Sequence, residues 1–183
     1  MKKLHRTRRQ EGFTLIETMV AMGVLSFGIL ALVGVFTQGL KTNSTNQIQF
    51  IAQAKAQEAI EDIFTARNTQ TLAWSQINNV SLGGVFLDGP QPLLAAGPDG
   101  LVGTADDLAN QPDTIVVGPP GTNDIQSTAG DQVINLNTMM TRTIAFSAVA
   151  SNPNLQKITV TITYTVQGQT NQFVLTTYIS CYS

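Results

Sequence analysis

The feature that most constrains this chain is a long apolar segment near its amino end. It runs from residue 13 to residue 36 (FTLIETMVAMGVLSFGILALVGVF) and contains one charged side chain, Glu17. At ~1.5 Å per residue, a helix of this length covers ~36 Å, which is enough to cross a hydrocarbon core of ~30 Å. The segment therefore predicts a membrane-spanning helix.

The residues before this segment are strongly basic. Five of the ten Lys and Arg side chains of the chain lie among residues 1–12: Lys2, Lys3, Arg6, Arg8 and Arg9. By the positive-inside rule, this end stays in the cytoplasm and the remainder lies outside. A secretory signal peptide would explain the basic start, but the apolar run exceeds the usual ~7–15 residues and no convincing small-residue cleavage site follows it. An uncleaved signal anchor explains the length and the flank, but not Glu17.

Composition excludes several function classes. The single histidine is His5, in the basic start, and the single cysteine is Cys181, so a Ser-His-Asp triad or a zinc site built from His and Cys lacks its residues. Residues 13–183 carry five basic and eleven acidic side chains, a net charge of −6. An acidic surface of this kind does not indicate nucleic-acid binding. We expect a protein that is not an enzyme.

Residues 43–66 continue at a helical period. Apolar side chains recur at spacings of three and four: Ile48, Ile51, Ala52, Ala56, Ala59, Ile60, Ile63 and Phe64. Polar side chains occupy the other positions: Gln49, Gln53, Gln57, Glu58, Glu61 and Asp62. Because no proline lies between residues 13 and 66, the apolar and amphipathic parts can form one continuous helix.

The rest of the chain divides into two regions of different composition. Residues 68–131 hold six of the seven prolines and predict mostly loop, with one short strand around residues 115–117. Residues 142–149, 157–166 and 171–180 predict strands, the last two joined at Gln167 and Gly168 as an antiparallel hairpin. In the middle strand Ile, Val and Tyr alternate with Thr, so its apolar face should pack on the amphipathic helix. The predicted fold class is α+β.

The most informative string is Gly12-Phe13-Thr14-Leu15-Ile16-Glu17. A basic leader ends in glycine, an aromatic residue opens the apolar run, and one carboxylate follows five residues after the glycine. This pattern resembles the prepilin signature of type IV pilins and type II secretion pseudopilins. The resemblance implies cleavage by prepilin peptidase after Gly12, N-methylation of Phe13, and an assembly role for Glu17.

The cost of an unpaired charge in an apolar helix supports that role for Glu17. An ionised side chain inside an apolar helix costs roughly 2.5–3.5 kcal/mol unless it is paired. Cleavage after Gly12 creates an amine at Phe13, which an adjacent subunit in a helix bundle can offer to Glu17. Pairing of these charges would favour recruitment of each subunit in register.

The resemblance also implies a domain organisation and partners. Residues 1–12 form a cleaved leader, 13–36 the transmembrane and filament-core helix, 37–66 the amphipathic helix, and 67–183 a pilin head with a variable loop and C-terminal sheet. Partners are other pilin subunits, prepilin peptidase, the inner-membrane assembly machinery and, before assembly, the membrane. The protein is expected in the inner membrane as a single-pass precursor, and then in a surface pilus or the periplasm.

Three functions stay open on the sequence alone. The segment after Glu17 (ETMVAMGVLSFGILALVGVF) looks most like PilV-type minor pilins, and the chain lacks the proline and the C-terminal cysteine pair often found in major pilins. A minor pseudopilin of a type II secretion system shares the same assembly chemistry. A membrane-anchored adhesin or binding module that never polymerises is the alternative from another class, and a membrane-tethered hydrolase is weaker because the mature chain has no histidine.

A second motif lies in the head. The string GPDGLVGTADD (residues 97–107) places three carboxylates around two glycines. Calcium prefers several oxygen ligands from a tight loop, backbone carbonyls included. The string resembles calcium loops of major pseudopilins, although its spacing does not fit an EF-hand. The candidate ligands are Asp99, Leu101, Asp106 and Asp107, with an ordinary acidic turn as the alternative.

Overall fold

The computed structural model describes residues 12–108, 111–117, 132–150 and 152–182. Contacts divide the chain into two compact units, Met1–Ser44 and Thr45–Ser183. The basic residues of the predicted leader lie outside the described residues. Each unit is described by itself below.

The described part of the first unit consists of residues 12–14 and the amino-terminal part of helix α1 (Leu15–Asn68). The predicted continuous helix is confirmed, and it begins two residues after Phe13. It is the one helix, among the described residues, that is long and apolar enough to cross a membrane. Its most apolar 18-residue window has a mean hydropathy of 2.4 and none of it is buried. The described residues of this unit therefore contain no core of their own.

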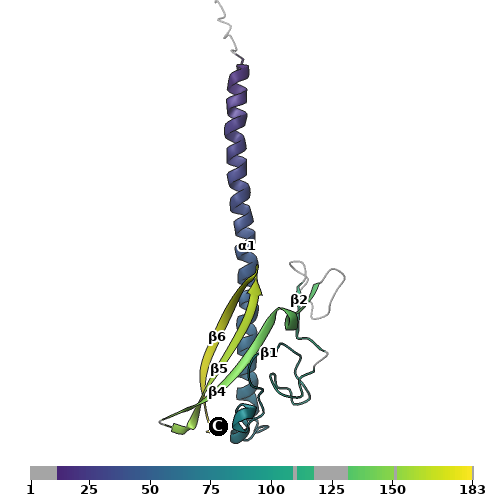
Figure 1. Cartoon of the computed structure of the whole chain (residues 1–183), viewed down its shortest axis with the longest axis vertical. Helices are drawn as coiled ribbons and strands as arrows, with labels where there is room; N and C mark the ends of the chain where they lie inside the picture. Colours follow the sequence, from purple (N-terminus) through teal and green to yellow (C-terminus); the bar gives the residue numbers. More distant parts are fainter. Residues whose placement is uncertain (1–11, 109–110, 118–131, 151, 183) are drawn as a thin grey trace, which may run out of the picture. The chain divides into compact units, whose positions relative to one another are not determined.

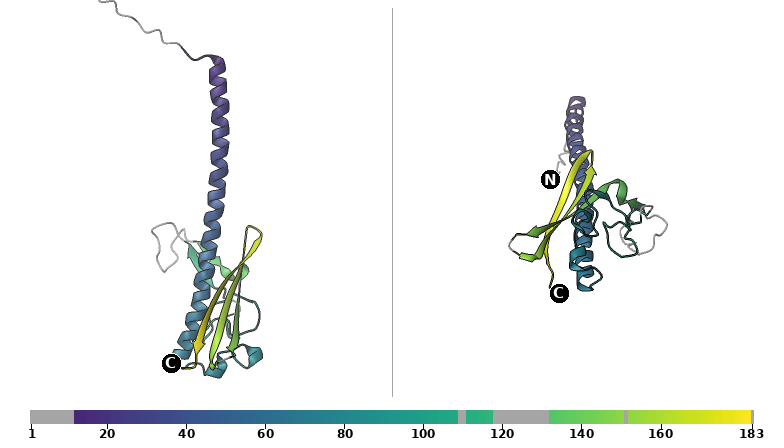
Figure 2. Two further views of the ribbon diagram at one scale, coloured as in Figure 1. Left: turned by 90° about the vertical axis from the view of Figure 1, so that its left-hand side faces the viewer. Right: turned by 60° about the horizontal axis from the view of Figure 1, so that its bottom comes forward.

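The second unit combines the end of α1 with an antiparallel sheet (Figures 1 and 2). Four strands pair in the order β1-β4-β5-β6: β1 (Gln91–Pro92), β4 (Met140–Val149), β5 (Asn152–Val166) and β6 (Gln169–Ser180). A second antiparallel pair joins β2 (Thr114–Val117) to β3 (Gln132–Asn135). Short 3₁₀ turns cover Trp74–Gln76, Val80–Leu82 and Leu136–Thr138. This arrangement confirms the predicted α+β class and is consistent with a pilin fold.

The β5–β6 hairpin forms where the sequence predicts it. Gln167 and Gly168 both have positive φ, 54° and 78°, as a two-residue type I′ turn requires. The register runs without a shift from Val166↔Gln169 to Leu155↔Ser180. β5 starts at Asn152, five residues earlier than predicted, because this start pairs with both neighbouring strands.

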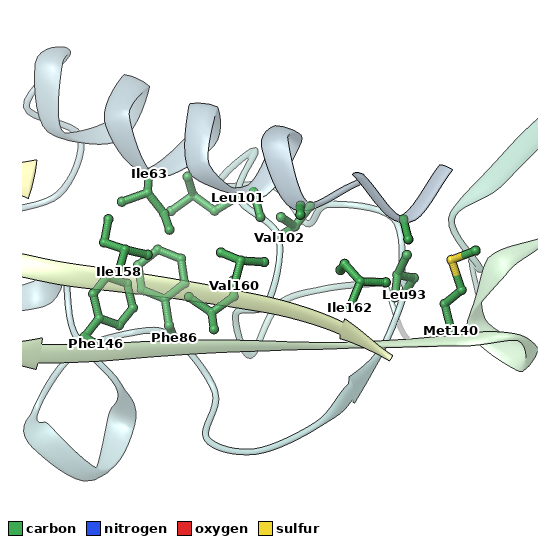
Figure 3. Close-up of a cluster of buried hydrophobic side chains, with 14 of the residues drawn as sticks. Ile63, Phe86, Leu93, Leu101, Val102, Met140, Phe146, Ile158, Val160 and Ile162 are labelled. Atoms are coloured by element: carbon green, nitrogen blue, oxygen red, sulfur yellow. The ribbon is translucent and has the colours of Figure 1, made fainter. Parts of the chain in front are cut away.

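The core lies between α1 and the inner face of the sheet (Figure 3). Small and branched side chains of the helix are fully or almost fully buried: Ala52, Ala56, Ala59, Ile63 and Ala66. The alternating apolar positions of β5 face them and are equally buried: Ile158, Val160, Ile162, Tyr164 and Val166. The predicted packing of the hairpin on the amphipathic stripe is confirmed. Glu58 and Asp62, predicted on the polar side, are instead half-buried.

The proline-rich region departs from the prediction in detail. Its described part contains two short strands, β1 and β2, and two 3₁₀ turns. Leu93 and Phe86 from this region are fully buried, and the Phe86 ring lies 5.1 Å from that of Phe146. Single inward-pointing apolar residues therefore fix this region on the sheet, a pattern too sparse to show a period.

A buried asparagine closes the edge of β4 beyond β1. Asn79 Nδ2 donates to Ile144 O at 2.8 Å, and Phe146 N–H donates to Asn79 Oδ1 at 3.0 Å. Asn79 is 6% exposed. One side chain thus makes the two backbone hydrogen bonds that a neighbouring strand would otherwise make with β4 at this point.

We expect Asn79→Ala to lower the free energy of unfolding by about 2–3 kcal/mol, because it leaves a buried N–H and a buried C=O without partners. Asn171→Ala, at an exposed strand position, should change it by less than about 0.5 kcal/mol. Denaturant unfolding of the full chain in detergent, followed by the Trp74 fluorescence, measures both. Equal losses in the two variants would contradict the edge-closing role.

Candidate functional site

The amino end of α1 has a defined cap. Residues 12–14 are not helical, and the helix begins at Leu15. Glu17 N–H donates to Thr14 Oγ1 at 3.3 Å, and the Thr14 carbonyl accepts from the N–H groups of Glu17 and Thr18 at 3.1 and 3.2 Å. Thr14 is therefore the N-cap residue, which satisfies donors that a helix start otherwise leaves open.

The predicted cleavage position lies just outside this cap. Gly12 and Phe13 precede the helix, and Phe13 is 82% exposed. A Cβ added at Gly12 would meet nothing within 4 Å. The fold thus gives no reason for glycine at this position, and the bond between Gly12 and Phe13 is free of the helical hydrogen-bond ladder. A peptidase can reach it without unwinding the helix.

Glu17 lies in the first turn of α1. Its carboxylate is therefore near the positive end of the helix dipole, where negative charge is favoured. The spacing Thr14-x-x-Glu17 is the sequence pattern of a capping box, a signal that the sequence analysis missed and that would have found Thr14. Glu17 can thus stabilise the amino end of its own helix, and its position also allows the predicted pairing with the amine of a neighbouring subunit.

Apart from Glu17, the helix surface from Leu15 to Phe36 presents large apolar side chains in every direction. Consecutive helical positions point about 100° apart, yet the large apolar residues from Leu15 to Phe36 are all 52% to 78% exposed. The set is Leu15, Ile16, Met19, Val20, Met22, Val24, Leu25, Phe27, Ile29, Leu30, Leu32, Val33, Val35 and Phe36. A helix that is hydrophobic on every side is stable inside a membrane or among other apolar helices.

In the head, the predicted calcium ligands stabilise their own loop. Asp99 accepts from the N–H of Leu101 at 2.8 Å, and Asp107 accepts from the N–H of Gly103 at 2.8 Å. Thr104 Oγ1 donates to Asp106 at 2.7 Å. Because these oxygens accept hydrogen bonds from the loop, each carboxylate acts as a turn cap in this structure.

The geometry of this loop does not by itself make a metal centre. Among the described residues, no three His, Cys, Asp or Glu side chains are placed to hold one metal ion. Leu101, whose carbonyl is the fourth predicted ligand, is 4% exposed. Calcium binding at Asp99, Leu101, Asp106 and Asp107 therefore stays a prediction.

A buried arginine organises the charges of the head, which the sequence analysis did not foresee. Arg142 on β4 is 1% exposed, and its guanidinium nitrogens have no hydrogen-bond partner among the described residues. Its positive charge interacts with the negative charges of four carboxylates: Asp107, Glu58, Asp113 and Asp62. Burial lowers the pKa of Arg142 from its ordinary value, while these carboxylates oppose the shift. The alternation of β4, which places position 142 on the same face as Met140 and Ile144, could have revealed it.

Burial also shifts the pKa values of two acids near Arg142. Desolvation, reinforced by Glu58, raises the pKa of Asp62 to about 6, and burial also raises the pKa of Asp107. Lys55 binds Asp113 at 2.8 Å and Glu58 at 2.7 Å. Burial alone would lower the Lys55 pKa, but its hydrogen bonds to Asp113 and Glu58 raise it. This cluster ties α1 to the loop and to β4, which is a structural role.

Comparison with known proteins identifies the amino-terminal segment. Residues 7–33 match the family model described as the prokaryotic N-terminal methylation motif. This match supports a type IV pilin-like prepilin. No curated protein and no solved structure matches the chain.

The motif carries coarse functional consequences. It implies processing by prepilin peptidase and assembly with other pilins, and it points to a structural subunit rather than an enzyme. Together with the apolar start of α1, it suggests membrane anchoring before assembly. The match covers the predicted Gly12, Phe13 and Glu17 but does not reach the head.

We expect Gly12→Ala to block removal of the leader without affecting the fold, because an added Cβ meets nothing. Intact mass of the chain recovered from membranes should then correspond to a start at Met1. Gly28→Ala, a glycine inside α1 with equally open surroundings, is the control and should give a chain that starts at Phe13. Normal processing of Gly12→Ala would contradict the predicted cleavage position.

We expect the head to lose stability as pH rises from about 4 to about 6. In that range the folded chain holds the Asp62 proton more tightly than the unfolded chain does, so ionisation of Asp62 disfavours folding. Asp62→Asn should remove this slope and raise the Tm of the full chain in detergent at pH 7 by about 2–4 °C or less, since Asp62 is only half-buried.

Asp106→Asn is the control, because the pKa of Asp106 is shifted in the opposite direction to that of Asp62. The Thr104 hydroxyl holds the pKa of Asp106 below its usual range, so its contribution is present above the unfolded pKa and is lost as pH falls. An unchanged slope in Asp62→Asn would show that another group causes the pH dependence.

Proposed function

We propose that this chain is a minor pilin of a type IV pilus. Prepilin peptidase cleaves it after Gly12 and methylates the new amine of Phe13. The mature chain then joins the filament through its apolar helix and presents its head to solvent. The observation that carries the proposal is the methylation-motif match over residues 7–33, together with a helix that is apolar on every side from Leu15 to Phe36.

The charge pair is the central step of this proposal. Glu17 is the only charged residue between Phe13 and Phe36, and it lies four residues after the residue that carries the new amine. Inside an apolar bundle, an unpaired carboxylate costs roughly 2.5–3.5 kcal/mol. The Phe13 amine of an adjacent subunit removes this cost, so the incoming chain is held where the two charges meet.

The same support extends to a minor pseudopilin of a type II secretion system. Both assemblies use the same leader, amine and glutamate, so the two functions differ in the machine that the subunit joins. Recovery of the chain in sheared surface filaments favours the pilus. Its retention in the periplasm, with loss of protein secretion on deletion, favours the secretion system.

The experiment that tests the assembly step replaces Glu17 by glutamine. Glutamine keeps the size of the side chain and its capping ability but removes the charge. We expect a processed, methylated and folded Glu17→Gln chain in membranes, with at least about tenfold less in sheared filaments, given the size of the pairing energy. Quantitative immunoblotting of both fractions measures the ratio.

Glu61→Gln is the matched control, because Glu61 is an exposed glutamate on the same helix. It should enter filaments at the wild-type level. If Glu17→Gln enters as well as the wild type does, pairing of Glu17 is not required. If the wild-type chain starts at Phe13 but never leaves the membrane, an anchored adhesin that does not polymerise is the better account.

A further inference from the structure

The two edges of the four-stranded sheet differ in how their backbone groups are satisfied. At one edge, β1 pairs with β4 at Thr141 and Arg142. Beyond β1, the Asn79 side chain binds the outward groups of Ile144 and Phe146. The chain therefore covers this edge of β4 with its own atoms from Thr141 to Phe146.

The opposite edge is β6, and it has none of the usual protection. The strand is twelve residues long and pairs with β5 without a bulge. Its sequence, QTNQFVLTTYIS, contains no charged residue, no proline and no glycine. Natural proteins blunt exposed edges with lysine, proline, bulges or very short strands. A long, regular and uncharged edge is suited to strand addition.

The hairpin geometry defines which backbone groups point outward. In an antiparallel pair closed by a two-residue turn, Val166 and Gln169 exchange hydrogen bonds, and every second residue does so after them. Cys181 N–H donates to Asn154 O at 2.9 Å, which continues this alternation at the far end. The outward set is Thr170, Gln172, Val174, Thr176, Tyr178 and Ser180.

Only the last member of this set is satisfied within the described chain. Arg67 Nη1 donates to Ser180 O at 2.9 Å, which confirms that the carbonyl points away from β5. Among the described residues, no hydrogen bond reaches the backbone groups of the other five. Five consecutive outward positions thus remain available to another strand.

The side chains indicate what kind of strand fits. On one face Val174 is 53% and Tyr178 55% exposed. On the other face Phe173 and Leu175 pack against the core but are only half-buried. An added strand with β-branched or aromatic side chains would extend both faces, whereas a charged one would meet no counter-charge on β6.

We propose that the β6 edge from Thr170 to Tyr178 binds an extended, uncharged segment of a different subunit by β-strand addition. The inference rests on the proposed assembly. One added strand buries far less than the ~1,600 Å² of a typical stable complex, so it suits a partner that packed apolar helices already hold nearby.

A second copy of this chain is a poor occupant for the same edge. Two β6 strands paired antiparallel about a two-fold axis normal to the sheet would place the two heads in opposite orientations. In the proposed filament all copies of the head share one orientation, so two copies of this chain do not pair in that way. The partner is therefore a segment of another subunit type.

Hydrogen exchange of the full chain tests the proposal directly. The wild-type chain is compared in detergent before assembly and in sheared filaments, with mass spectrometry that resolves single amides. The amides of Thr170, Gln172, Val174, Thr176 and Tyr178 should exchange fast in detergent and about tenfold or more slowly in filaments. The amides between them, bonded to β5, should be slow in both samples.

The outcomes separate this inference from the proposed function. If the chain is present in filaments but the outward amides still exchange fast, strand addition is overturned and the pilin assignment stands. If the chain is absent from filaments, both are overturned.

Two substitutions test the edge in cells. Val174→Pro removes an outward N–H and leaves the bonds to β5 in place, and Thr176→Lys adds a charge at the edge. Each should lower the filament content several-fold while the membrane content stays normal. Thr165→Lys places the same charge on the same sheet face, one strand further in, and should have no effect. Wild-type filament content in both edge variants would overturn the proposal.

Self-pairing is tested with Val174→Cys in a Cys181→Ser background. In a two-fold antiparallel pair centred on this position, the two Cα atoms would lie ~5.5 Å apart, within reach of a disulfide. We expect no disulfide-linked homodimer under mild oxidation in membranes. A dominant homodimer would overturn the assignment to a different subunit.

Discussion

The contact between the second half of α1 and the apolar face of β5 is the interaction on which the head depends. On the helix this contact is made by alanine at positions 52, 56, 59 and 66 and by Ile63, all buried in the core. The facing residues of β5 are β-branched at Ile158, Val160 and Ile162, which suits a pleated surface. The proline-rich region and the buried arginine are both placed against this contact.

The buried charges are a consequence of that packing. Arg142 takes an inward position on β4, so its charge must be balanced from the helix and the loop. Replacing such a group by an apolar residue is often neutral, whereas removing one partner of a buried charge is strongly destabilising. The cluster thus links three segments that are distant in the sequence. Its raised pKa values, at Asp62 and Asp107, reflect the burial that this linkage requires.

The amino-terminal half of the helix is not stabilised in the way that the head is. It has no core, and its apolar side chains face outward in every direction. The head has a hydrophobic core within one chain, but this segment needs a membrane or other helices. The same asymmetry recurs in the sheet, where Asn79 closes one edge and the other edge is left open. Both unsatisfied regions are suited to a protein that functions within an assembly.

The sequence alone determined the continuous helix, the β5–β6 hairpin and the faces that pack together, because each is set by a local period of 3.6 or 2 residues. It also determined the processing motif, since Gly12, Phe13 and Glu17 lie within a few residues of one another. Tertiary structure decided the burial of Arg142, the edge-closing role of Asn79 and the hydrogen bonds of Asp99, Asp106 and Asp107. The first two depend on contacts between distant segments, such as Asn79 with Ile144, for which a single sequence has no periodic signal. The hydrogen bonds of the three aspartates are local, but they depend on the conformation of an irregular loop, which has no repeating pattern either.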